Sequence, residues 1–176
     1  MTAFQRKKNR LRPEEYRGRR RYFLTLCCEK RFPAFRSPKA AEQALHILRD
    51  CAVATAFHVH AYCFMPEHLH LLVEGANDQS VLSGFVKRFK QISGHRFHRT
   101  TGRLLWQAKF YDHILRSEDD LTSVCAYIWL NPVRRGLCRE TSDYPFSGSL
   151  TMPWKGQPQN AQAWTPPWRA TEKMPA

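Results

Sequence analysis

The sequence predicts an α+β fold of the ferredoxin-like type, in which a βαββαβ antiparallel sheet is covered by helices and a further C-terminal helix follows. Two patterns support this prediction. Short runs rich in aromatic and β-branched residues are typical of strands, and longer stretches carry apolar residues at helical spacing. The stretches follow one another as strand, helix, strand, strand, helix, strand and helix, which is the ferredoxin-like order.

The first half of the pattern contains one strand, one helix and a hairpin. Residues 21–29 contain the run Tyr22-Phe23-Leu24-Thr25-Leu26-Cys27-Cys28, which predicts the first strand. Apolar residues between Ala40 and Ala56 recur every three or four positions, as on one face of a helix. Phe57–Met65 and His68–Glu74 then predict two strands joined by a tight turn at Pro66 and Glu67.

The second half contains a helix, a strand and the last helix. Ser80 to about Phe97 has one apolar face, and Leu104–Leu115 resembles a strand. Ser117 is a plausible N-cap for the last helix, because the three acidic residues after it suit the positive end of a helix. That helix is expected to end near Leu130, since Pro132 disfavours helical geometry in the residue before it.

The chain divides into three parts by composition. We expect residues 1–20 to be a basic N-terminal arm, residues 21–149 to form the folded domain, and residues 150–176 to be an irregular tail. The tail carries five prolines and three tryptophans, too few apolar residues for a core of its own. Its indoles either stay loose or lie on the domain.

The charge of the chain predicts its partner. The net charge is +13, and the span from Gln79 to Tyr111 holds seven Lys or Arg and no Asp or Glu. Since a solvated surface usually mixes both signs, an acid-free span of this length indicates a polyanion, with nucleic acid preferred over an anionic membrane. The alternative is a basic protein whose charge serves solubility alone.

The six cysteines show no C-x-x-C spacing, so zinc-finger geometry is not expected, and most lie in apolar runs as small buried hydrophobes. Nothing suggests a disulfide framework, which fits a cytoplasmic, nucleoid-associated protein. The basic N-terminus lacks the apolar region of a signal peptide, and no run approaches transmembrane length.

Two His-x-His pairs are candidates for a metal site. His58 and His60 lie in one strand of the hairpin, and His68 and His70 lie in the other. Side chains two residues apart on a strand share a face, so either pair places two imidazoles together. A tight turn would put the two pairs on opposite faces, whereas a one-residue bulge would reverse that. Periodicity does not choose between them.

The last helix carries Tyr127 and Asn131 one turn apart. A carboxamide oxygen at a helix end is a ligand suited to Mg²⁺ or Mn²⁺, and a phenol can act as a nucleophile. The structural alternative makes Tyr127 an aromatic residue at the core edge and Asn131 the N-cap of a following turn that begins with Pro132.

These motifs together resemble the REP-associated tyrosine transposases, relatives of the single-tyrosine HUH transposases, over about residues 22–149. The matching motifs are Met65-Pro66 before His68-Leu69-His70, Leu105-Trp106-Gln107, Phe110-Tyr111-Asp112, Tyr127-Ile128, and Asn131-Pro132-Val133-Arg134-Arg135-Gly136-Leu137.

The resemblance implies a role for each site residue. It makes Tyr127 the catalytic nucleophile and His68, His70 and Asn131 the ligands of Mg²⁺ or Mn²⁺, and it leaves the other histidine pair outside the motif. Glu67 departs from the pattern, since Asn is more usual there. The implied reaction is cleavage and strand transfer of single-stranded DNA at palindromic repeat hairpins, through a 5′-phosphotyrosine. Asp112 and His113 are the candidate general bases.

The DNA contacts are expected from the acid-free span and from the Asn-Pro-Val-Arg block. Trp106 or Tyr111 is the expected stacking surface for an unpaired base. The predicted DNA-binding residues are Lys87, Arg88, Lys90, Arg96, Arg99, Arg103, Trp106, Lys109, Arg134 and Arg135. The sequence leaves open whether the protein is a monomer or a homodimer.

Two other classes of function compete with the transposase. One is a non-catalytic ferredoxin-like module that binds nucleic acid, although the aromatic signature of an RNA-recognition motif is missing. The other is a two-histidine phosphodiesterase, which would need His-x-Ser or His-x-Thr twice, and neither occurs.

Overall fold

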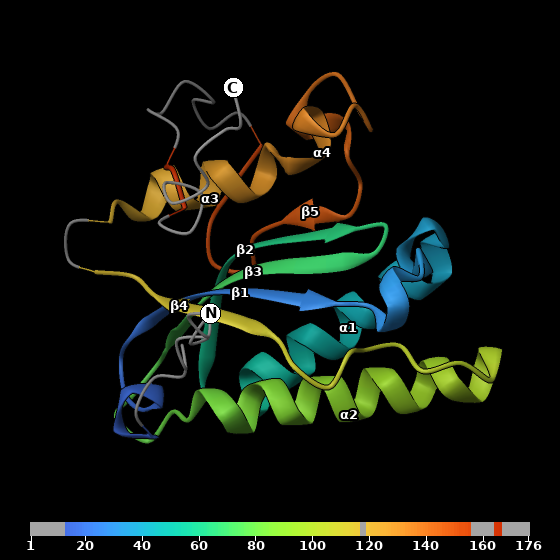
Figure 1. The fold of residues 1–176 in the computed structure, drawn as a ribbon. Coiled ribbons are helices and arrows are strands. Elements are labelled where there is room, and N and C mark those ends of the chain that lie inside the picture. Colours follow the sequence, from blue (N-terminus) through green and yellow to red (C-terminus); the bar gives the residue numbers. More distant parts are fainter. Residues whose placement is uncertain (1–12, 117–118, 156–163, 167–176) are drawn as a thin grey trace, which may run out of the picture.

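The computed structural model describes residues 13–116, 119–155 and 164–166. It contains an antiparallel sheet with strand order β4-β1-β3-β2-β5, which confirms the predicted α+β class (Figure 1). The four longer strands and two helices follow the order βαββαβ, as predicted. The strands are β1 (Arg21–Cys27), β2 (Phe57–Met65), β3 (His68–Gly75), β4 (Tyr111–Ile114) and β5 (Ser147–Gly148). The helices are α1 (Pro38–Ala54), α2 (Leu82–Thr101), α3 (Leu121–Trp129) and α4 (Asn131–Arg134), and the 3₁₀ turns are η1 (Pro13–Tyr16), η2 (Glu29–Arg31), η3 (Ala34–Arg36) and η4 (Thr141–Asp143).

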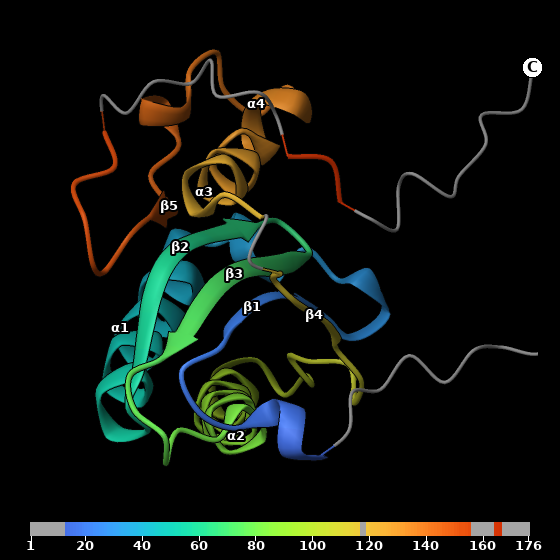
Figure 2. The same cartoon turned by 90° about the vertical axis from the view of Figure 1, so that its left-hand side faces the viewer.

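The sheet is covered on both faces (Figure 2). Helices α1 and α2 lie on one face and α3 and α4 on the other. Alternate residues of β1 therefore enter different cores: Tyr22 and Leu24 pack with the α1–α2 side, whereas Phe23 packs with α3. This alternation explains why the strands read as nearly continuous apolar runs.

The β2–β3 hairpin contains a bulge, and this bulge decides which face of the sheet carries His58 and His60. Met65 pairs with His68 and Cys63 with His70, but the register shifts between Val59 and Ala61. The shift turns His60 toward Glu74, which lies on the same face as His70. The bulged alternative is therefore the correct one, and both histidine pairs face α3.

The boundaries of the two long helices follow from local chemistry. Ser37 accepts a hydrogen bond from the Ala40 amide and caps α1, and Pro38 occupies the first turn. Helix α2 ends at Gly102, whose φ of 69° lies in the left-handed region that glycine adopts without strain. Helix α2 thus continues past the predicted end near Phe97.

Two further boundary predictions were wrong. Strand β4 covers only Tyr111–Ile114, because the residues before it form a loop that pairs through a single bridge, between Trp106 and Cys28, with the residue after β1. Helix α3 is capped by Asp120, whose carboxylate accepts from the Ser123 amide. Ser117, the predicted cap, lies outside the described residues.

The ends of the chain are partly ordered on the domain. Residues 13–20 are not a free arm, since Arg17 bridges to Val81 and the Tyr16 hydroxyl donates to Asp112. In the predicted tail, Trp154 packs against Trp129 with ring centroids 5.6 Å apart. The remainder of the predicted arm, residues 1–12, and most of the tail lie outside the described residues.

All six cysteines are free thiols, and four of them are buried as the apolar context predicts. Within the described ranges, no helix combines the length and the apolar character that crossing a membrane requires.

Candidate active site

His68 and His70 lie side by side on the α3-facing side of β3. Their Nε2 atoms are 3.0 Å apart, and the rings stand nearly perpendicular to each other with centroids 4.5 Å apart. Both side chains are buried. The strand geometry therefore brings the two imidazoles together as predicted.

A separate partner holds the other nitrogen of each ring. The Nδ1 atom of His68 lies 3.2 Å from the Glu67 carboxylate, and that of His70 lies 2.9 Å from the Thr25 hydroxyl. A proton on each Nδ1 would leave the Nε2 atoms of both rings unprotonated and able to bind a metal. Burial also lowers the pKa of His68 to about 4, which keeps its ring neutral at physiological pH.

These two partners refine the sequence prediction. Thr25 was not singled out, although a lone hydroxyl in the apolar run of β1 was a usable signal. Glu67, which departs from the family pattern, contacts His68 and also accepts from Arg135 at 3.5 Å. The carboxylate therefore orients a ring at the site.

The imidazole geometry fits a divalent metal. Two cis ligands at about 2.1 Å from an octahedral metal are ~3.0 Å apart, and the two Nε2 atoms have this separation. Among the described residues no group of three or more His, Cys, Asp or Glu side chains is arranged to hold a metal. A third ligand of another type is thus needed.

Asn131 is the predicted third ligand. Its side chain is buried at the start of α4, and its amide nitrogen donates to the carbonyls of Tyr127 at 2.9 Å and Ile128 at 3.3 Å. The residue preceding α4 is Leu130, so the alternative in which Asn131 is the N-cap was wrong. Because its nitrogen faces α3, the side-chain oxygen is the atom that can coordinate a metal.

Tyr127 lies on α3 above the sheet and reaches the same region as the histidines. Its ring packs edge-on against Phe23 at 6.0 Å, and Phe23 lies 5.5 Å from the His70 ring. The guanidinium of Arg134 stacks 4.4 Å from the Tyr127 centroid and donates to the Tyr127 carbonyl at 3.0 Å. One aromatic ring on β1 therefore lies between the predicted nucleophile and His70.

Trp164 covers this region. Its ring lies 5.3 Å from Tyr127 and 5.4 Å from Phe23, and its indole N–H donates to Asp119 at 2.9 Å. Tyr127 is only 4% exposed as a result of this packing. A segment from the predicted tail thus lies directly over the predicted nucleophile.

The sheet register places the two candidate general bases on opposite faces of the sheet. His113 pairs with Phe23, so both face α3, and the His113 ring lies 6.3 Å from Trp164. Asp112 pairs with Leu24 and points to the opposite face, where it accepts from Tyr16. Of the two, only His113 is on the face of the site.

The second histidine pair forms a separate network. His60 lies 2.8 Å from Glu74 and 3.0 Å from the Thr151 hydroxyl, and His58 is exposed beside it. Glu74 is four residues from His70, which is about 13 Å along an extended strand. His58 and His60 therefore share the face of the site but not the site.

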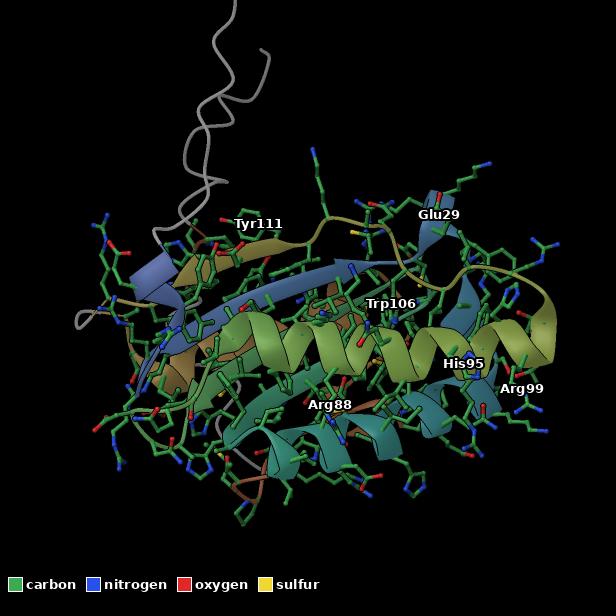
Figure 3. The ribbon with its side chains drawn as sticks, turned by 90° about the horizontal axis from the view of Figure 1, so that it is seen from below. Glu29, Arg88, His95, Arg99, Trp106 and Tyr111 are labelled. Atoms are coloured by element: carbon green, nitrogen blue, oxygen red, sulfur yellow. The ribbon has the colours of Figure 1, made fainter. Side chains whose placement is uncertain are left out.

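The predicted DNA-binding residues do not all remain available. Trp106 is buried, donates its indole N–H to Ser93 at 2.8 Å and packs on Phe35, so the prediction that it stacks on bases was wrong (Figure 3). Lys90 donates to the carbonyls of Gln107 and Ala108 and ties that loop to α2. The basic residues that remain exposed are Lys87, Arg88, Arg96, Arg99, Arg103, Lys109, Arg134 and Arg135.

The comparison with protein families identifies the family of the chain. A family model described as "Transposase IS200 like" matches residues 18–130. The chain belongs to this family. The matched span includes both histidines of β3 and ends three residues after Tyr127.

Two curated relatives carry a more specific description. The REP-associated tyrosine transposase of Escherichia coli strain K12 is 33% identical over 94 residues, 52% of this chain and 53% of that protein. A candidate REP-associated tyrosine transposase of Haemophilus influenzae is 26% identical over 139 residues, 72% of this chain and 77% of that one. The match thus spans about half the length of the E. coli relative.

A solved structure shows the same fold. The REP-associated tyrosine transposase bound to a REP hairpin superposes with a TM-score of 0.64 at 23% identity, over 84% of this chain and 82% of that one. At this identity the likeness concerns the fold. It agrees with the family assignment.

Proposed function

We propose that this transposase cleaves and rejoins single-stranded DNA at palindromic repeat hairpins, with Tyr127 as nucleophile and Mg²⁺ or Mn²⁺ as cofactor. The observation that carries the proposal is the convergence of the His68 and His70 Nε2 atoms, 3.0 Å apart, beside the Phe23 ring that also contacts Tyr127. The hairpin substrate follows from the relatives, which are named for the repeats, and from the neighbour that binds one.

Each residue of the site has its own role in the proposed reaction. His68, His70 and Asn131 would hold the metal, which supplies positive charge to a phosphate oxygen when it is bound. Glu67 and Thr25 fix the imidazole rings through their Nδ1 atoms. Arg134 stacks on the Tyr127 ring and adds a positive charge next to it.

The covalent step exchanges one phosphodiester for another. The Tyr127 oxygen attacks phosphorus, the bond to the 3′ oxygen breaks, and the strand leaves with a free 3′-OH. The phenol proton passes to a base or to the leaving oxygen. His113 is the candidate base that lies on the same face of the sheet as the site. A 3′-OH reverses the attack and rejoins DNA, so the bond energy is retained.

One observation favours the competing function, a non-catalytic DNA-binding module. Tyr127 is 4% exposed beneath Trp164, so a DNA phosphate does not reach its hydroxyl in this conformation. The transposase proposal therefore requires that Trp164 move before cleavage. The binding-module alternative requires no such movement.

A covalent adduct separates the two functions. We expect the protein to form a stable adduct with a labelled hairpin carrying single-stranded flanks in Mn²⁺, and to form none in EDTA. Tyr127→Phe should remove the adduct while preserving the fold and the DNA binding, because the ring contacts with Phe23 and Arg134 do not use the hydroxyl. An adduct that persists in this variant would show that another residue is the nucleophile.

A further inference from the structure

Four hollows that share lining residues follow one another around one end of the molecule. This end contains the β2–β3 turn, the loop between β1 and α1, and the C-terminal end of α2. Neighbouring hollows share lining residues: Pro33 lines three of them, and Lys39 lines two. We call the four together the end groove.

The largest hollow lies between α1 and α2, on the face of the sheet opposite Tyr127. Its volume is about 730 Å³, and its lining includes Lys39, His95, Arg96 and Arg99 but no acidic residue. Figure 3, which views this helical face, shows His95 and Arg99 following Arg88 along α2. These side chains are exposed, so a polyanion can reach them.

The middle of the groove carries an exposed aromatic ring. Phe32 is 37% exposed and lines the hollows of about 560 and 220 Å³, and the guanidinium of Arg103 lies 4.8 Å from its centroid. An aromatic ring flanked by cations is the arrangement on which unpaired bases stack. Phe32 therefore offers the stacking surface that the buried Trp106 does not.

The last hollow shares one residue with the predicted active site. Its volume is about 250 Å³, and Arg31, Arg36 and Arg135 line it together with Glu67. Glu67 also contacts the His68 ring, so this hollow adjoins the residues that hold the imidazole pair. Three arginines therefore lie at the end of the groove that is next to the site.

Hydrogen bonds to the β2–β3 turn hold both ends of the loop that forms the middle of the groove. The Cys28 amide donates to the Glu67 carbonyl at 2.9 Å, and the Phe35 amide donates to the Pro66 carbonyl at 3.0 Å. Lys30 and Arg31 adopt φ values of 48° and 56°, in the left-handed region that residues other than glycine adopt only at an energetic cost. The groove is thus shaped before any ligand binds.

We propose that the end groove holds the phosphodiester backbone of the DNA substrate and leads it from the active site around the end of the sheet to the α1–α2 face. Eight Lys or Arg line the groove against Glu29 and Glu67, and Glu67 is already paired with Arg135. This inference rests on the proposed DNA substrate but not on the cleavage chemistry. The backbone is that of the hairpin stem or of its single-stranded flank.

Binding measurements in the absence of chemistry test this inference. The background is Tyr127→Phe without metal, and the probes are a labelled hairpin with flanks, the same hairpin without flanks, and a single strand. Arg96→Gln/Arg99→Gln should weaken binding about tenfold and reduce the log–log salt slope by about 1.4 on a single strand or about 1.8 on a duplex. The control Arg139→Gln/Lys155→Gln removes equal charge from exposed positions outside the groove and should change both values little.

The probes identify which part of the DNA occupies the α1–α2 hollow. A loss on the flankless hairpin assigns it to the stem, and a loss confined to the flanked and single-stranded probes assigns it to the flank; both support the groove. Phe32→Ala should weaken binding of the flank, and Phe32→Tyr should retain it. Thermal melting of each variant verifies that the fold is intact.

Equal effects of the groove pair and the control pair would overturn the inference, because binding would then follow net charge alone. Failure of this inference can be distinguished from failure of the proposed function. A protein that binds through the groove but never forms an adduct supports the inference and removes the proposed reaction. A protein that forms the adduct while the groove pair binds unchanged removes the inference alone.

Discussion

At the scale of single residues, the site depends on groups that orient the histidines as much as on the histidines themselves. The Nε2 atom of each imidazole lies next to that of the other ring, and the Nδ1 atom is held by a neighbour, Glu67 for His68 and Thr25 for His70. A ring that can rotate loses part of its metal affinity, since its lone pair no longer points at the metal. Two predictions follow from this arrangement.

Thr25→Val should weaken the response to metal without unfolding the protein. The substitution keeps the branched shape and removes the hydroxyl that contacts His70 Nδ1. We expect about tenfold more Mn²⁺ to be needed for half-maximal adduct formation. Thr55→Val, whose hydroxyl only bonds the Cys51 carbonyl at the end of α1, is the control. An unchanged Mn²⁺ requirement would remove Thr25 from the site.

The two histidine pairs should respond differently to alanine. His68→Ala and His70→Ala should abolish Mn²⁺-dependent cleavage. His60→Ala should leave cleavage intact but cost about 1–3 kcal/mol of stability, because it leaves the half-buried Glu74 short of a partner. Cleavage across a Mn²⁺ series and chemical denaturation measure the two effects. Cleavage lost in a folded His60 variant would mean that the wrong pair was chosen.

At the scale of elements, the segment that holds Trp164 is the one placed to control access. Its ring packs on Tyr127, Phe23 and His113, and its indole N–H donates to Asp119. The indole must move before a phosphate can approach the Tyr127 hydroxyl, so the position of this segment decides whether the nucleophile is accessible.

Trp164→Ala should therefore speed adduct formation, because it removes the ring over Tyr127. The matched control is Trp154→Ala, which removes an indole that packs on Trp129 instead. A truncation after residue 150 should behave like Trp164→Ala in rate and remain folded, although with a lower melting temperature. Single-turnover adduct formation measures the rate, and a slower Trp164 variant would show that the indole assists the reaction.

At the scale of the whole molecule, the buried histidines make stability depend on pH. Burial lowers the pKa of His60, His68 and His113, with His68 at about 4 against an ordinary 6.5. Between the folded and unfolded pKa values, the unfolded chain therefore binds protons that the folded protein does not bind. This contribution to stability is complete above about pH 6.5 and is lost as the pH falls toward 4.

We accordingly expect the melting temperature to fall steadily between pH 6.5 and 4. His68→Gln removes the most strongly shifted of these groups and should flatten the profile. Calorimetry across this range without metal measures both proteins. A parallel decline in the two would mean that other groups cause the acid sensitivity.

Local patterns in the sequence determined the order of the elements and the two candidate histidine pairs, and the family resemblance chose between the pairs. Strand periodicity alone placed His68 and His70 on one face, and helical periodicity placed Tyr127 near the end of α3, because each depends on neighbours within a few positions. The same local information located the β2–β3 turn at Pro66 and Glu67.

The tertiary structure alone decided which distant groups meet. The bulge after Val59 turned His60 toward the site face, the register of β4 placed His113 rather than Asp112 on that face, and packing against Phe35 buried Trp106. The contacts of Thr25 with His70 and of Trp164 with Tyr127 join residues 45 and 37 positions apart. Such contacts depend on how whole elements pack, and no window of sequence contains both partners.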